Sequence, residues 1–192
     1  MPSDHELEKM GNDYAVWFEK YGYSYQSVGW NKPKHTHRYA SLIKQFKDLD
    51  GFKEFHVVDM GCGLGHLIEE LTNHGWSGKY TGIDLNPDFI EHCSERYPEH
   101  SFHCEAVDRT KIRGDLIFAV GTFNRRFSDS KAFLSHCLSN WQQSASAGLA
   151  VSLLSVKAND KYNLNYYVAL KQVEEIWDRN KKDRLTVDAR SL

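Results

Sequence analysis

The sequence predicts one α/β fold, a doubly wound and mainly parallel sheet with helices on both faces. From residue 51 onward, short apolar segments typical of strands alternate with segments whose apolar residues recur at helical spacing. These strand segments are apolar throughout, as in strands that are covered on both faces. With 192 residues, 41% of them hydrophobic, the chain is long enough to bury a core.

Composition and charge exclude several classes of function. The formal charge of −2 comes from mixed acidic and basic residues with no basic stripe, which argues against nucleic acid and anionic membranes as partners. The N-terminus is too polar for a signal peptide, and no apolar run approaches the roughly 20 residues of a membrane span. The cysteines form no CxxC pair, so we expect reduced thiols in a cytoplasmic protein. They are Cys62, Cys93, Cys104 and Cys137.

Residues 1–50 are predicted to form an N-terminal helical and aromatic lid segment, and residues 51–192 the main domain. Aromatic residues crowd positions 12–30, where they could cover a site or simply pack as an amphipathic helix. We favour packing for Trp17 and Phe18, and a place in the site for Tyr25 and Trp30. A helix is expected to begin near Pro33, in the first turn, and to end at Gly51.

The next segments alternate in type. Residues 55–60 read as a buried strand, residues 64–71 as a helix and residues 79–85 as a second strand. Asn86 and Pro87 supply the cap and first turn of another helix, which ends before Pro98. Further strands are expected at 101–107, 115–123, 149–156 and 184–189. Helices are expected over 133–141, capped by Ser128 or Asp129, and over 166–179.

A glycine-rich loop, Asp59-Met60-Gly61-Cys62-Gly63-Leu64-Gly65, follows the first strand. Its spacing is GxGxG, whereas dinucleotide-binding folds use GxGxxG, and His66 holds the position of their third glycine. An acid two residues before the first glycine repels phosphate but can orient an ammonium group. No Gly-Lys-Ser/Thr follows, so the loop is not a P-loop either.

The loop VVDMGCGLG resembles the first motif of class I S-adenosylmethionine-dependent methyltransferases, whose sheet is Rossmann-like. Further motifs follow in the family's order: GIDLNP, CEAVD and DLIFAVGTFN. The resemblance implies that Asp84 binds the ribose, that Glu105 meets the adenine amino group while Ala106 packs on the ring, and that Gly121 lies beneath the cofactor. The implied cofactor-binding residues are Asp59, Gly61, Cys62, Gly63, Gly65, Asp84, Leu85, Glu105, Ala106, Gly121 and Arg38.

Some of these assignments have alternatives. Asp108 is an equally placed acid if the strand before it is one turn longer than expected. Asp84 could merely cap the helix that follows it. Arg38 could hold the cofactor carboxylate through a charge-assisted pair or lie on a helix surface. Cys62 is interpreted as a small side chain whose backbone N–H faces the cofactor. No metal site is predicted, because the His-x-His and His-x-x-His pairs lack a third ligand.

The resemblance implies in-line methyl transfer from S-adenosylmethionine to a small-molecule acceptor, with S-adenosylhomocysteine as product. No catalytic residue is assigned, since orientation alone can supply much of the rate enhancement. The upstream segment around Trp30 and Arg38 and the downstream NLNYYV are similar to a bacterial subgroup of the family. The acceptor-site candidates are Tyr25, Trp30, Asn124, Tyr166 and Tyr167. The alternative function is a non-catalytic, methyltransferase-like binding or scaffold protein.

Sheets of this family have seven strands, and here the sequence stops at Leu192, soon after the strand expected at 184–189. We therefore expect the seventh strand to be missing and one edge of the sheet to be uncovered. An uncovered edge favours aggregation or pairing with a second copy, so a homodimer through this edge is expected.

Overall fold

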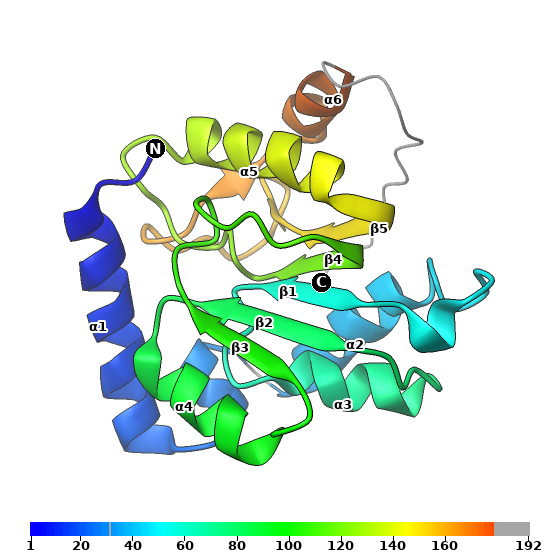
Figure 1. The fold of residues 1–192 in the computed structure, drawn as a ribbon. Coiled ribbons are helices and arrows are strands. Elements are labelled where there is room, and N and C mark those ends of the chain that lie inside the picture. Colours follow the sequence, from blue (N-terminus) through cyan, green and yellow to red (C-terminus); the bar gives the residue numbers. More distant parts are fainter. Residues whose placement is uncertain (31, 179–192) are drawn as a thin grey trace.

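The computed structural model describes residues 1–30 and 32–178. Its centre is a parallel sheet of five strands in the order β3-β2-β1-β4-β5 (Figure 1). The strands are β1 (Val57–Met60), β2 (Tyr80–Asp84), β3 (Ser101–Cys104), β4 (Gly114–Val120) and β5 (Ala145–Ser152). The predicted doubly wound α/β fold is confirmed.

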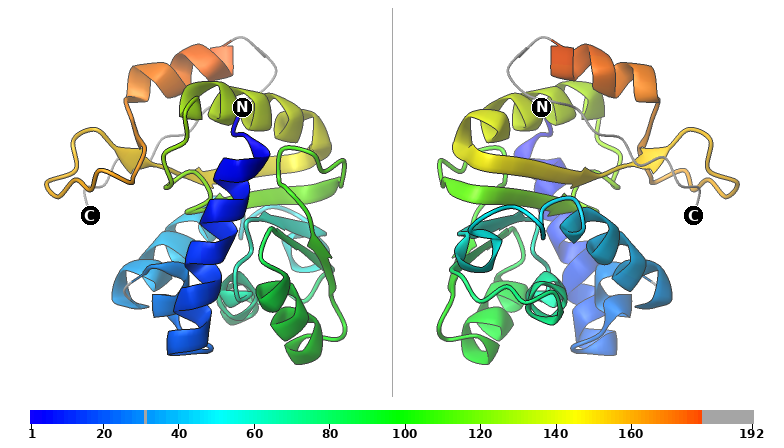
Figure 2. Two further views of the ribbon diagram at one scale, coloured as in Figure 1. Left: turned by 90° about the vertical axis from the view of Figure 1, so that its left-hand side faces the viewer. Right: turned by 90° about the vertical axis from the view of Figure 1, so that its right-hand side faces the viewer.

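Helices cover both faces of this sheet. On one face lie α2 (Lys32–Ile43), α3 (His66–Asn73) and α4 (Pro87–Arg96); on the other lie α5 (Ser130–Ser144) and α6 (Leu170–Asp178). The first helix, α1 (Asp4–Tyr21), packs on neither face. It runs across the end of the sheet, from the side of α5 to the side of α4 (Figure 2). No helix among the described residues is long and apolar enough to cross a membrane.

Two helix starts follow from residues that the sequence singles out. The side chain of Asn86 accepts hydrogen bonds from two backbone N–H groups in the first turn of α4, at 2.9 and 3.2 Å, and Pro87 fits that turn. For α5, the cap is Asp129 and not Ser128, because the Asp129 carboxylate accepts from the backbone N–H of Ala132 at 3.0 Å. These caps fix where the chain leaves β2 and β4.

The sheet separates two apolar cores, and alternate strand residues face each of them. On the side of α2 and α3, the core includes Tyr39, Ile43, Val57, Leu67, Leu71, Tyr80, Leu116 and Phe118. On the side of α5, it includes Leu7, Val58, Met60, Ile83, Ile117, Phe133, Leu134 and Trp141. Because β1 and β4 lie in the middle and are covered on both faces, their ends are held rigidly.

The C-terminal third departs most from prediction. The fifth strand begins at residue 145, earlier than expected. Residues beyond Ser152 leave the sheet, and β6 (Leu154–Ser155) pairs only with β7 (Tyr167–Val168). The helix predicted over 166–179 begins at Leu170, since the residues before it pair as β7. The strand expected at 184–189 lies outside the described residues. Within the described chain, β5 forms one edge of the five-stranded sheet.

Candidate functional site

A cleft lies at the carboxyl ends of the central strands, between the sheet and α1. Strand order reverses between β1 and β4, which is where open α/β sheets bind their ligands. The walls come from α1, from the 3-10 helix η1 (Tyr25–Val28) with Trp30, from the loops after β1 to β4, and from α5. The lining residues are Leu7, Met10, Gly11, Tyr14, Val28, Trp30, Gly61, Gly63, Asp84, Leu85, Asn86, Phe89, Val107, Asp108, Val120, Gly121, Thr122, Phe127 and Phe133.

In the glycine loop, two residues without side chains, Gly61 and Gly63, line the cleft. Gly61 has a φ of 82° and Gly63 a φ of 52°, in the left-handed region that side chains rarely adopt. A Cβ on Gly61 would lie 2.9 Å from Oγ1 of Thr122, and one on Gly63 would lie 2.9 Å from Cγ1 of Val28. Only glycine therefore fits both the backbone and the space. Gly65 does not line the cleft; it precedes α3 as its cap.

Asp84 ties the end of β2 to the glycine loop. One carboxylate oxygen accepts from the backbone N–H of Gly63 at 2.8 Å, and the other accepts from the backbone N–H of Asn86 at 3.0 Å. Burial raises the pKa of this carboxyl group, and the backbone donors oppose that shift. Each oxygen keeps a further lone pair, so Asp84 can still accept hydrogen bonds from a ligand in the cleft.

The third strand supplies a different acid from the one the motif suggests. β3 ends at Cys104, and the backbone N–H of Glu105 donates to the carbonyl of Asp84 at 3.0 Å. Glu105 is absent from the cleft lining, whereas Asp108 lines it. Oδ1 of Asp108 is buried and has no hydrogen-bond partner among the described residues. Ala106 packs in the apolar core, and its neighbour Val107 reaches the cleft.

Two further residues of the glycine motif are buried beneath the loop. Asp59 is 2% exposed and accepts a hydrogen bond from the Tyr80 hydroxyl at 2.7 Å. The backbone N–H of Cys62 donates to the carbonyl of Ile83 at 3.0 Å, so the expectation that this N–H faces the ligand is wrong. The Cys62 thiol is buried, and burial together with a contact to Cys93 raises its pKa. These features give the thiol no sign of reactivity.

Trp30 lies over the end of β4, beside the cleft. A Cβ on Gly121 would be 2.3 Å from its Cζ2, so the indole requires a glycine there. The guanidinium of Arg38 stacks on the indole, with Cζ 4.1 Å from the ring centre. Nε of Arg38 is buried without a hydrogen-bond partner in the described chain, and burial lowers its pKa. Arg38 is thus a half-buried cation held against Trp30, next to the cleft.

The remaining acceptor-site candidates lie outside the lining. The ring of Tyr25 stacks on His66 at 4.0 Å. Oδ1 of Asn124 is buried and has no hydrogen-bond partner in the described part of the chain, and the backbone carbonyl of Asn124 accepts from the N–H of Tyr166 at 2.8 Å. The Tyr166 hydroxyl accepts from Gln172, while the Tyr167 hydroxyl accepts from the Tyr162 backbone at 2.8 Å. Both tyrosine hydroxyls therefore form hydrogen bonds within the segment after β5.

The sequence interpretation expected a lid segment over residues 1–50 but did not identify the α1 residues that line the cleft. Leu7, Met10, Gly11 and Tyr14 line it from this helix. Their spacing of 3, 4 and 7 residues marks one helical face. This pattern could have identified α1 as a wall.

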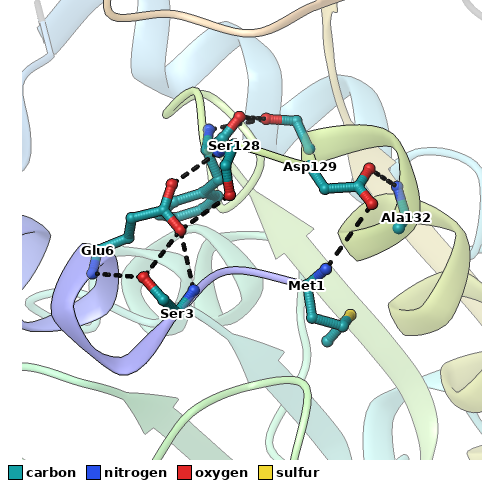
Figure 3. A network of polar contacts seen from close by, with 8 residues as sticks. Met1, Ser3, Glu6, Ser128, Asp129 and Ala132 are labelled. Atoms are coloured by element: carbon teal, nitrogen blue, oxygen red, sulfur yellow. Dashed lines mark hydrogen bonds and ion pairs between the residues drawn. The ribbon is translucent and has the colours of Figure 1, made fainter.

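Exposed polar contacts hold α1 in place. The Glu6 carboxylate accepts from the N–H of Ser128 at 2.7 Å and from its hydroxyl at 3.0 Å (Figure 3). Two ion pairs, Asp4–Arg109 at 2.5 Å and Asp13–Arg125, lie along the same helix. The amino group of Met1 lies 3.9 Å from the carboxylate of Asp129 (Figure 3).

Acidic and apolar groups dominate the chemistry of the cleft. Among the described residues that line it, Asp84 and Asp108 are the charged ones, and most of the others are apolar. No group of three or more metal-ligating side chains occurs within the described residues. The arrangement suits a ligand with hydroxyl or amino donors and a flat apolar part that enters against glycine backbone.

Comparison with known proteins gives the family. The family described as "Methyltransferase domain" matches residues 57–143, from β1 to the end of α5. Residues 57–143 thus match a methyltransferase domain, on a sheet of the class I type. Its Rossmann-like sheet, glycine loop and strand-end acids are the elements that the sequence resemblance named.

Relatives of this methyltransferase domain include malonyl-(acyl-carrier protein) O-methyltransferase of Acetivibrio thermocellus, 28% identical over 88 residues, or 44% of this chain and 31% of that protein. Trans-aconitate 2-methyltransferase of Rhodopseudomonas palustris is 41% identical over 46 residues, 24% of this chain and 18% of that protein. The matches thus span less than half of each relative.

Solved structures agree on the fold of the methyltransferase domain. Magnesium protoporphyrin IX methyltransferase of Synechocystis PCC 6803, crystallised with S-adenosylhomocysteine, has a TM-score of 0.66 at 12% identity. The superposition covers 92% of this chain and 85% of that one. At this identity the likeness establishes the architecture, and the chemistry has to be argued from the residues of the cleft.

Proposed function

We propose that the protein binds S-adenosylmethionine in the cleft and transfers its methyl group to a small-molecule acceptor. The observation that carries this proposal is the pair of cleft acids, one at the end of β2 and one in the loop after β3. Asp84 is held against the glycine loop by the Gly63 N–H, and Asp108 presents a buried oxygen that has no hydrogen-bond partner among the described residues. A nucleoside without a phosphate offers ribose hydroxyls and an adenine amino group, which are the donors that two such acceptors need.

The residues of the cleft fit each part of this cofactor. Asp84 would accept hydrogen bonds from the ribose hydroxyls, and Asp108 from the adenine amino group. Phe89 and Val107 supply apolar surface against which an adenine ring would pack. Gly61 and Gly63 allow the methionine part to approach the backbone, where a side chain at either position would clash. Arg38, half-buried beside Trp30, would hold the cofactor carboxylate.

When bound, the cofactor supplies an activated methyl group on a sulfonium. The protein then has to orient the acceptor in line with it and exclude water, and orientation can be worth about 7–11 kcal/mol. Trp30 and Tyr14 form apolar walls suited to both tasks. No histidine, lysine or arginine occurs among the described lining residues, so we assign no general base. The same observation favours, as second candidate, a binding or scaffold protein without turnover.

The same proposal covers the class of methyl acceptor, the cellular location and the oligomeric state. A small molecule is favoured because the cleft is lined by apolar residues and two acids. In addition, the net charge of −2 does not attract nucleic acid. We also propose a cytoplasmic location and pairing of two copies through β5, the strand at one edge of the sheet within the described residues. Analytical ultracentrifugation tests the pairing, which predicts a dimer at micromolar concentration.

Titration calorimetry tests the function. S-Adenosylmethionine and S-adenosylhomocysteine should bind, whereas NAD should not. Exclusive binding of NAD would overturn the proposal. Incubation with methyl-labelled cofactor and a panel of small hydroxy, amino and carboxylic acids then separates the two candidates. Transfer of label to any of them supports an enzyme, while cofactor binding with no transfer favours the scaffold.

A further inference from the structure

The buried acid Asp59 lies immediately before the glycine loop and has no cationic neighbour that pairs with it in the described chain. Its carboxylate is 2% exposed and accepts a hydrogen bond from the Tyr80 hydroxyl at 2.7 Å. The other titratable groups that face it are Asp84 on β2, Tyr39 on α2 and Cys62 in the loop. None of them carries a positive charge.

Such an environment disfavours the ionised form of the acid. Burial raises the pKa of Asp59 to about 7, and the negative charge of Asp84 acts in the same direction. The hydrogen bond from Tyr80 opposes the shift, because it stabilises the carboxylate. Near neutral pH the free protein therefore holds Asp59 as a mixture of carboxylic acid and carboxylate.

The sheet register explains how Tyr80 reaches this acid. Asp59 pairs with Gly82 on β2, and Val57 pairs with Tyr80. Because Gly82 has no side chain, the phenol of Tyr80 can extend diagonally to Asp59. A Cβ at Gly82 would lie 2.8 Å from Sγ of Cys62, so the space is closed to larger residues. The Tyr80 ring is fully buried, which fixes the position of its hydroxyl.

The acid is also close in the chain to the proposed ligand. Gly61, two residues after Asp59, lines the cleft and would lie against the methionine part of the cofactor. The ammonium and sulfonium of that part are positive, and its negative carboxylate is the group proposed to bind Arg38. Because Asp59 is buried, its interaction with a positive group at the loop is weakly screened, so a bound cation favours the ionised form of Asp59.

We propose that Asp59 and Tyr80 form a proton-coupled pair that responds to the cationic cofactor. This inference rests on the proposed function. When the cofactor binds, the O–H bond of the Asp59 carboxylic acid breaks, the proton passes to the buffer, and the carboxylate balances the positive ligand. Tyr80 is a positioning residue that acts through Asp59, because its hydroxyl stabilises only the charged product of this step.

Calorimetry at pH 6 and pH 8, in two buffers of different ionisation enthalpy, tests the proposal. The isosteric variant D59N removes the titrating group and keeps an oxygen for the Tyr80 hydroxyl. With a pKa of about 7, ionisation of Asp59 should tighten wild-type binding about tenfold between these two pH values, beyond any change shared with D59N. At pH 7 the wild type should release about half a proton more than D59N.

The role of Tyr80 is tested by Y80F, with Y97F as matched control. Tyr97 also donates its hydroxyl to a carboxylate, that of Glu69 at 3.3 Å, but remote from Asp59. Y80F should move the pH dependence of affinity to higher pH, and Y97F should leave it unchanged. Thermal unfolding of each variant checks that it is folded.

Each part of the proposal can fail separately. Equal pH slopes and proton counts for the wild type and D59N overturn the coupling, and a Y80F profile that superimposes on the wild type overturns the role of Tyr80. If neither ligand binds at any pH, the proposed function fails instead. An infrared difference spectrum of the wild type at pH 6 needs no variant: cofactor binding should remove a protonated-carboxyl band, and an unchanged band contradicts the proposal.

Discussion

The two walls of the cleft are built in different ways. On the sheet side, Asp84, Gly61 and Gly63 are fixed by backbone hydrogen bonds between buried strands and by contacts that leave no room for a Cβ. On the other side, α1 has one buried residue, Leu7, and is held by polar contacts at its exposed face. Buried, geometrically closed contacts are hard to replace, whereas exposed ion pairs contribute little individually. We therefore infer a rigid wall that selects the ligand and a weakly held wall that covers it.

The largest effect should come from Asp84→Ala in the rigid wall. This change removes the proposed ribose acceptor and the hydrogen bonds from the Gly63 and Asn86 N–H groups. A charged hydrogen bond is worth roughly 1.5–3 kcal/mol, so cofactor affinity should fall by about tenfold to a hundredfold. Calorimetry measures the cofactor affinity, with Asp88→Ala in the exposed first turn of α4 as control. Unchanged affinity would mean that the sheet side does not select the ligand.

Next in size is the effect of Gly61→Ala. Forcing a side chain into the left-handed region against Thr122 should lower the free energy of unfolding by about 1–3 kcal/mol and weaken cofactor binding. Gly75→Ala is the matched control, since Gly75 has the same φ of 82° with no atom within 4 Å of a Cβ. Chemical denaturation measures the free energy of unfolding of both variants. Equal losses would show that backbone strain, and not the closed space beside the cleft, sets the cost.

A smaller effect on cofactor binding is expected at the two acids after β3, Asp108 and Glu105. Asp108→Ala should weaken cofactor binding by about tenfold, since a ligand amino group loses its acceptor, and Glu105→Ala should change it little. Calorimetry with both ligands distinguishes them, and adenosine alone should show the same order. If Glu105→Ala has the larger effect, the adenine lies on the other side of this loop.

The smallest effect is expected at α1. Glu6→Gln weakens the contact with Ser128, so the cofactor should dissociate faster, by less than about threefold, with little change in thermal stability. Stopped-flow fluorescence measures the rate, and Glu8→Gln on the exposed side of the same helix is the control. Hydrogen bonds from Ser3 and Ser128 lower the pKa of Glu6 to about 2. The wild-type contact should therefore persist above pH 4.5 and weaken as pH falls toward 2. A large loss of stability in Glu6→Gln would show that α1 is part of the rigid wall.

Much of the rigid wall could be predicted from sequence, because local patterns determine it. Apolar strands, the Asn86 cap and the spacing of the glycines each specify a short stretch of chain, and the structure confirms the parallel sheet that they predict. Placing Asp84 beside the loop needs only the rule that parallel strands end at one edge.

The rest depends on long-range contacts or on small shifts in strand length. Whether Glu105 or Asp108 reaches the cleft depends on β3 ending at Cys104, and strand ends are not fixed by periodicity. That α1 covers the cleft depends on contacts with residues more than 100 positions away. The pairing of β6 with β7 involves two residues in each strand, too few for a recognisable pattern.

The separation between Glu6 and Ser128, 122 positions along the chain, has a consequence for biosynthesis. A chain is synthesised from its N-terminal side, so α1 leaves the ribosome well before its partners at Arg109, Arg125 and Ser128. The apolar face of α1 therefore stays exposed to solvent until the loops after β3 and β4 have been synthesised. The cleft is consequently completed late in synthesis, and a bulky fusion placed before Met1 would interfere with this last step of assembly.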